Sequence, residues 1–160
     1  MILEEKETKE KETKERLLEI LIDLKKRTGV WNSLLVTEDG LVIASDDISQ
    51  IMGNLETMGY YQNIGAVSAG ALSMAEQSIK LIDTNKELKQ LIIHAGSADS
   101  LYLESFSIIL TLVHTNIILL VIYPSVLNIG LILYEIENVG MEIHQYLSDG
   151  EHILHEESVL

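Results

Sequence analysis

Two histidines near the C-terminal end of the sequence lie among acidic side chains, a combination that can hold a divalent metal ion. His152 and His155 are three residues apart and are flanked by Glu151, Glu156 and Glu157. A metal site requires ligands whose positions are fixed by the fold. The polar, acidic segment 149–160 offers no such scaffold, so we interpret it as a flexible tail and predict no metal site.

The other residues with catalytic potential do not form a catalytic pattern. Asp46 and Asp47 are adjacent in sequence, and neighbours seldom face one site, so a turn or helix cap is favoured over general acid-base chemistry. The isolated His94 and His114 are expected to satisfy local hydrogen bonds. No serine lies in a nucleophile elbow, and no glycine-rich loop precedes a Lys-Ser/Thr pair. We predict no catalytic residue, no cofactor and no enzymatic activity.

The distribution of charge excludes further classes of function. The chain has 160 residues and a formal net charge of −14, but residues 1–27 are neutral because they hold eight basic and eight acidic side chains. Residues 28–160 contain three lysines and no arginine. Nucleic acid binding depends on clustered basic residues, so nucleic acid is not an expected partner. A basic protein surface would suit this acidic body.

The amino-acid composition also indicates the cellular compartment in which the protein is expected. The sequence contains no cysteine and no apparent signal peptide, which favours a reducing, cytoplasmic setting. Its longest apolar segment, 107–123, is interrupted by the polar residues 114–116 and is too short to span a bilayer. We expect no membrane insertion.

A short β-hairpin is the clearest structural element. Residues 34–36 and 41–44 are apolar runs separated by the turn Thr37-Glu38-Asp39-Gly40, and Asp-Gly suits a tight turn with positive φ. Both runs are apolar on both faces, so the sheet should be covered on both sides.

Two helices are expected before and after this hairpin. Residues 1–27 predict a helix whose first half, 1–13, is a charged helical or disordered extension and whose second half carries a leucine stripe. Residues 60–82 predict a helix rich in small side chains, with a flat face formed by Ala66, Ala69, Gly70 and Ser73. This face permits close packing against the chain's own sheet or against the same helix of a second subunit, and the sequence leaves both open.

The rest of the chain predicts three strands and a final helix. The strands are expected at 88–95, 108–113 and 117–123, and an amphipathic helix follows at 127–147. Residues 46–58 are expected to form a polar connection, and 96–107 are ambiguous. The predicted order is α-β-β-α-β-β-β-α, with one domain over 14–148.

Three of these segments resemble the Roadblock family in sequence and order. They are residues 29–45 (GVWNSLLVTEDGLVIAS), 66–81 (AVSAGALSMAEQSIKL) and 120–139 (LVIYPSVLNIGLILYEIENV). The resemblance implies an α+β sandwich: a five-stranded antiparallel sheet with one long helix on one face and two helices on the other. Bacterial and archaeal members regulate small Ras-like GTPases, and other members act as scaffolds.

The resemblance also implies a dimer, formed as a homodimer or with a related Roadblock protein. Its interface would include the small-residue helix and the adjacent edge strand, here Ala66, Ala69, Gly70, Ser73, Leu91 and Ile93. Glu76 and Lys80, near the end of the helix, are the residues expected to touch a GTPase. The function implied is a non-enzymatic regulatory or scaffold module.

Two alternatives remain open. A longin- or profilin-like sensory domain would bind a small ligand or peptide between sheet and helix. A protein that stimulates GTP hydrolysis with its own residues would need a polar group devoted to that role, and residues 28–160 contain no arginine for it.

Overall fold

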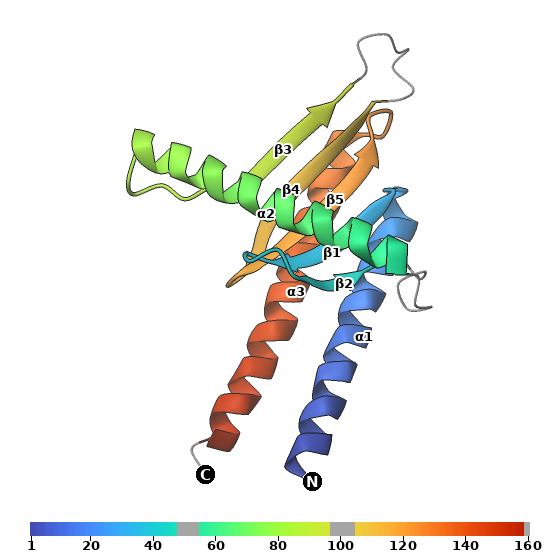
Figure 1. Ribbon diagram of the computed structural model, residues 1–160, viewed down its shortest axis with the longest axis vertical. Helices are drawn as coiled ribbons and strands as arrows, with labels where there is room; N and C mark the ends of the chain where they lie inside the picture. Colours follow the sequence, from blue (N-terminus) through green and yellow to red (C-terminus); the bar gives the residue numbers. More distant parts are fainter. Residues whose placement is uncertain (48–54, 97–104, 159–160) are drawn as a thin grey trace.

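The computed structural model describes residues 1–47, 55–96 and 105–158, with only the backbone described at 55–58 and 151–158. Figure 1 shows a central sheet with helices on both faces. The elements are α1 (Ile2–Thr28), β1 (Asn32–Thr37), β2 (Val42–Ser45), α2 (Leu55–Ile82), β3 (Gln90–Ala95), β4 (Phe106–His114), β5 (Ile117–Pro124) and α3 (Ile129–Ser158). None of the helices in the described part of the chain has the length and apolarity needed to cross a membrane.

The five strands form one antiparallel sheet in the order β2-β1-β5-β4-β3. β5 lies at the centre, because it pairs with β1 on one side and β4 on the other. Seven of its eight residues are apolar, and six are buried. β2 and β3 are the two edges.

Alternate side chains of the central strands enter two separate cores. Leu35 of β1 and Val121 of β5 pack with the buried residues of α1 and α3, whereas Leu34, Val36 and Leu120 pack under α2. Successive residues of a strand face opposite sides of a sheet, so strands that are apolar at every position require cover on both faces. The predicted arrangement of one helix opposite two is thus confirmed.

α1 and α3 lie side by side, and their chain directions are opposite (Figure 1). Arg16 Nη2 lies 3.0 Å from Glu142 Oε1, and Arg27 Nη1 lies 2.9 Å from Glu135 Oε2. These ion pairs are partly exposed, so each contributes little beyond the apolar packing between the helices. Both helices extend past the sheet in the same direction, so the start of α1 and the end of α3 lie at the same end of the molecule.

The hairpin turn is packed against α2. Gly40 has φ +87°, as the Asp-Gly turn predicts, and a Cβ built on it would lie 2.6 Å from the Cα of Ala66. A Cβ on Gly65 would lie 2.9 Å from Val36 Cγ1 and 3.1 Å from the carbonyl oxygen of Gly40. The turn and the helix therefore approach closely only because glycines lie at the contact.

Several boundaries differ from the sequence-based expectations. α2 begins at Leu55, inside the segment 46–58 that we expected to be a connection, and β4 begins at Phe106 rather than Ile108. α3 remains helical to Ser158, although 149–158 were assigned to a loose tail. Most of the ambiguous segment 96–107 lies outside the described residues. The order of elements is as predicted.

Replacing Gly40 by alanine should destabilise the protein more than the same change at Gly29. Both glycines are left-handed, with φ +87° and +79°, and that conformation costs an alanine about 1–2 kcal/mol. A Cβ at Gly29 meets no atom within 4 Å, whereas one at Gly40 would collide with the α2 backbone. Urea denaturation of the two variants measures the difference. Equal losses of stability would show that the hairpin is not pressed against α2.

Candidate functional site

The outer side of α2 carries an apolar stripe that nothing in the described part of the chain covers. Val67, Met74 and Leu81 are seven residues apart and are 74%, 71% and 89% exposed. Gly70 lies between the first two and is also exposed, and a Cβ built there would meet no atom within 4 Å. Large exposed side chains aligned on one helix face mark a surface for protein contact.

The four small residues predicted to form one flat face are divided between two environments. Ala69 is buried against the α2 side of the sheet, and Ala66 contacts the hairpin turn at Gly40. Gly70 and Ser73 are exposed on the outside. Ala66 and Ala69 thus pack within the chain, as the first alternative requires. Gly70 and Ser73 are exposed and could contact a second subunit, as the other alternative requires.

The edge strand β3 continues this exposed surface. Leu91 packs against the α2-side core, whereas Ile93 on the same face of the strand is exposed. Leu112 of β4 is also exposed, because α2 lies mainly over β1, β2 and β5. Figure 1 shows the last turns of α2 extending beyond β3. The α2 side of the sheet is therefore only partly covered within one chain.

Glu76 and Lys80 lie near the C-terminal end of α2, four residues apart. Glu76 is half-buried and Lys80 is exposed. Neither residue lies on the apolar stripe, because Glu76 is two residues after Met74 and Lys80 is one residue before Leu81. This position suits the rim of an interface better than its centre, because charged groups are depleted at interface centres.

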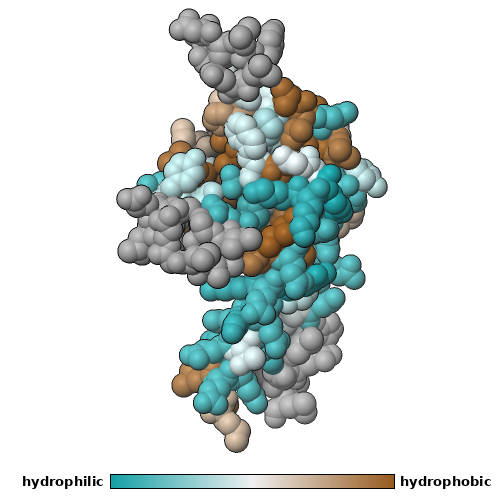
Figure 2. Space-filling model, turned by 90° about the vertical axis from the view of Figure 1, so that its right-hand side faces the viewer, coloured by the Kyte–Doolittle hydropathy of each residue, from teal (hydrophilic) through white to brown (hydrophobic). Residues whose placement is uncertain are grey.

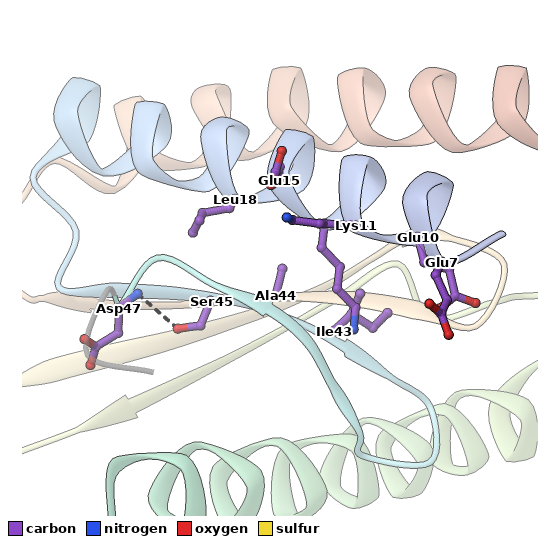
Figure 3. A pocket seen from close by; sticks show the side chains of 10 residues that line it. Glu7, Glu10, Lys11, Glu15, Leu18, Ile43, Ala44, Ser45 and Asp47 are labelled. Carbon is purple, nitrogen blue, oxygen red and sulfur yellow. Dashed lines mark hydrogen bonds between the residues drawn. The ribbon is translucent and has the colours of Figure 1, made fainter. Parts of the chain in front are cut away.

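A groove of about 580 Å³ runs between α1 and the edge strand β2. Figure 3 shows Lys11 extending from α1 toward Ile43, with Leu18 and Ala44 further along and Glu7 and Glu10 beside it. In Figure 2, hydrophilic side chains cover most of the lower, projecting part of the molecule, and hydrophobic ones gather higher up. The groove combines an apolar floor with walls of mixed charge.

A polar network joins β1, the end of β2 and the start of α2. The Tyr61 hydroxyl donates to Asp47 Oδ2 at 2.7 Å and accepts from Asn32 Nδ2 at 2.9 Å. Burial and the hydrogen bond to Asp47 raise the pKa of Tyr61 above its ordinary value. Tyr61 therefore stays protonated and holds α2 to the sheet. Asp47 does not cap α2, since that helix begins eight residues later.

Asp46 lies in a different environment from its neighbour. Its side chain is 4% exposed, and Ser33 Oγ donates to its Oδ2 at 3.3 Å. Its Oδ1 is buried and has no hydrogen-bond partner in the described part of the chain. Burial raises the pKa of this carboxyl group, although hydrogen bonding to Ser33 and the charge of Lys25 oppose the shift. The two aspartates face different partners, so they do not act as an acid-base pair.

The histidines are arranged in a way that the sequence did not indicate. His114, at the end of β4, places its Nδ1 2.9 Å from the Nδ1 of His144 on α3. His94 Nδ1 lies 2.8 Å from Ser107 Oγ on the neighbouring strand β4, 13 residues away, so its partner is not local in sequence. No group of three or more His, Cys, Asp or Glu side chains with metal-site geometry occurs in residues 1–47, 59–96 and 105–150.

Comparison with known proteins identifies related sequences and folds. The sequence model of the Roadblock/LC7 domain matches residues 17–123, from the buried half of α1 to β5. Among curated proteins, a search finds no significant match.

Several solved structures have the same fold. MglB in a tetrameric arrangement superposes with a TM-score of 0.66 at 14% identity, covering 83% of this chain and 88% of that chain. MglB of Myxococcus xanthus gives a TM-score of 0.64 at 17% identity, covering 83% and 88%. A Roadblock/LC7 domain from Streptomyces avermitilis gives 0.63 at 15% identity, covering 81% and 95%. At these identities the likeness concerns the fold.

Replacing Asp46 by asparagine should stabilise the protein at pH 7, and this gain should shrink as the pH is lowered. In the wild type the folded state binds the Asp46 proton more tightly than the unfolded chain, whose pKa is near 3.8. This group therefore stabilises the fold fully below pH 3.8, and its contribution is lost as pH rises through the raised pKa. We expect Asp46→Asn to have a higher urea midpoint than the wild type at pH 7 and a shrinking advantage toward pH 4.

The exposed Asp149 supplies the control for this experiment. Asp149→Asn changes the net charge equally but removes no buried carboxylate. A loss of stability in Asp46→Asn at pH 7 that persists at pH 4 would instead assign Asp46 a hydrogen-bonding role.

Proposed function

The chain belongs to the Roadblock/LC7 family, and we propose that it is a cytoplasmic, non-enzymatic regulatory or scaffold module that dimerises and docks a small Ras-like GTPase. The observation that carries this proposal is the family match over residues 17–123, joined to an exposed apolar surface on α2 and β3. The partner class is the one that the family resemblance implies.

The proposed dimer pairs the outer stripe of α2 and the edge strand β3 with the same elements of a second copy. A symmetric interface is self-complementary, so one patch can bury itself against its copy. Pairing β3 with its counterpart would cover an edge that is otherwise open to aggregation. It would also cover Ile93 and Leu112, which α2 of the same chain leaves exposed.

The proposed GTPase surface lies where two copies of the sheet and the ends of α2 meet. Glu76 and Lys80 would lie at its rim, and the acidic body would complement basic groups on the partner. Arg16 and Arg27 are engaged in ion pairs between α1 and α3, and residues 28–160 contain no other arginine. Any stimulation of GTP hydrolysis would therefore work by repositioning the GTPase's own residues rather than through an arginine finger.

The substitution Gly70→Leu should prevent dimerisation without destabilising the folded monomer. The site is open within one chain, and leucine favours a helix over glycine by about 1 kcal/mol, so the monomer should not lose stability. In the proposed dimer the added side chain would prevent close approach of the helices. Light scattering should show a dimer for the wild type and a monomer for this variant.

Gly150→Leu is the matched control, since it places the same side chain on an exposed, open glycine of α3. It should remain dimeric. A monomeric wild type at high micromolar concentration, or an unchanged mass for Gly70→Leu, would refute the proposed interface.

Docking can be tested by measuring the mass of the purified chain mixed with a small GTPase from the same genome. We expect a larger complex with the GTP-analogue form than with the GDP form. Glu76→Lys and Lys80→Glu should weaken that complex while leaving the dimer intact, whereas Glu137→Lys on an exposed part of α3 should have no effect. A dimer that binds no GTPase in either state would leave only the scaffold role.

The groove between α1 and β2 supports a second candidate, a sensory domain that binds a small ligand or peptide. Its volume of about 580 Å³ is in the range of small-molecule sites. Specific thermal stabilisation by a metabolite, abolished by Ala44→Trp in the groove, would favour this function. Stabilisation by none of a broad metabolite set would count against it.

A further inference from the structure

The contact between His114 and His144 brings together two nitrogen atoms that can each bind a metal ion. Their Nδ1 atoms are 2.9 Å apart, and the ring centroids are 4.9 Å apart at an interplanar angle of 55°. A hydrogen bond across this gap uses one Nδ1 as the donor and the other as the acceptor. Without that hydrogen, two nitrogen lone pairs would converge on one point.

The two histidines are held in place by different parts of the fold. His114 is 8% exposed at the end of β4, and His144 lies on the surface of α3. One helical turn before His144, a Cβ built on Gly140 would lie 3.2 Å from Val113 Cγ1, so α3 is close to this strand. The pair therefore lies where α3 packs against β4, so the backbone of each histidine belongs to a packed element of the fold.

We propose that His114 and His144 form a binding site for a divalent transition-metal ion such as Ni²⁺ or Cu²⁺. An ion about 2.0–2.1 Å from each nitrogen would have the two ligands at an angle of roughly 90°, which suits neighbouring positions of a tetragonal site better than a tetrahedral one. Imidazole is a common ligand for these ions, and hard cations such as Mg²⁺ prefer oxygen.

Binding to both Nδ1 atoms requires a change of tautomer. Both neutral rings would carry their hydrogen on Nε2, so the hydrogen that now lies between the rings moves to the far nitrogen of the donor ring, and both Nδ1 lone pairs become available. The remaining positions on the ion would be filled by water, because two side chains do not complete its coordination. An ion at this position would link α3 to the end of β4.

Isothermal titration of the untagged full-length protein with NiCl2, and separately with CuCl2, tests the site. We expect one ion per chain, a higher melting temperature with the ion present, and loss of the ¹⁵N NMR signals of the Nδ1 atoms of His114 and His144 through paramagnetic broadening. MgCl2 should produce none of these effects. His144→Gln changes an exposed residue and should abolish binding without unfolding the protein, as should His114→Gln when circular dichroism shows it folded.

Two controls separate this site from the other histidines. His94→Gln and the double variant His152→Gln/His155→Gln should bind the ion as the wild type does. Absence of binding by the wild type, retention of binding by His144→Gln, or loss of binding only in the His152/His155 double variant would each overturn the proposal.

Discussion

The fold depends on the burial of β1 and β5 on both of their faces. Leucine, isoleucine and valine occupy three consecutive positions of β1 and the first six positions of β5, so neither face of the sheet centre can be left in water. α1 and α3 together cover one face, and α2 covers the other. The placement of all three helices follows from this requirement, and so does the close contact at Gly40, which lets α2 lie directly over the hairpin.

α2 covers its face of the sheet only in part, so one end of that face is buried and the other is partly exposed. Over β1, β2 and β5 the helix buries small and apolar side chains, but it leaves Ile93 of β3 and Leu112 of β4 exposed. The same helix is therefore a core element along its inner side and an exposed apolar surface along its outer side. A helix with low side-chain volume can serve both purposes, because backbones can approach it from either direction.

Much of this architecture could be predicted from local sequence patterns, whereas contacts between distant segments could not. The Asp-Gly turn, the leucine stripe of α1 and the amphipathic pattern of α3 each depend on residues close in sequence, and each is confirmed. The side of α2 that faces the sheet was not predictable, because alanine, glycine and serine give no hydrophobic direction. The His114–His144 contact joins residues 30 positions apart and has no sequence pattern. The start of α2 at Leu55 was missed because residues 46–58 have weak periodicity.

The antiparallel pairing of α1 and α3 has a consequence for how the protein can be attached to something larger. Because the start of α1 and the end of α3 lie at the same end of the molecule, any anchor, linker or neighbouring domain joined beyond either helix would leave in one direction (Figure 1). β3 lies toward the other end, so an attachment there would leave the β3 surface unobstructed. The two long helices would then act as a stalk that presents the sheet at a distance from its point of attachment.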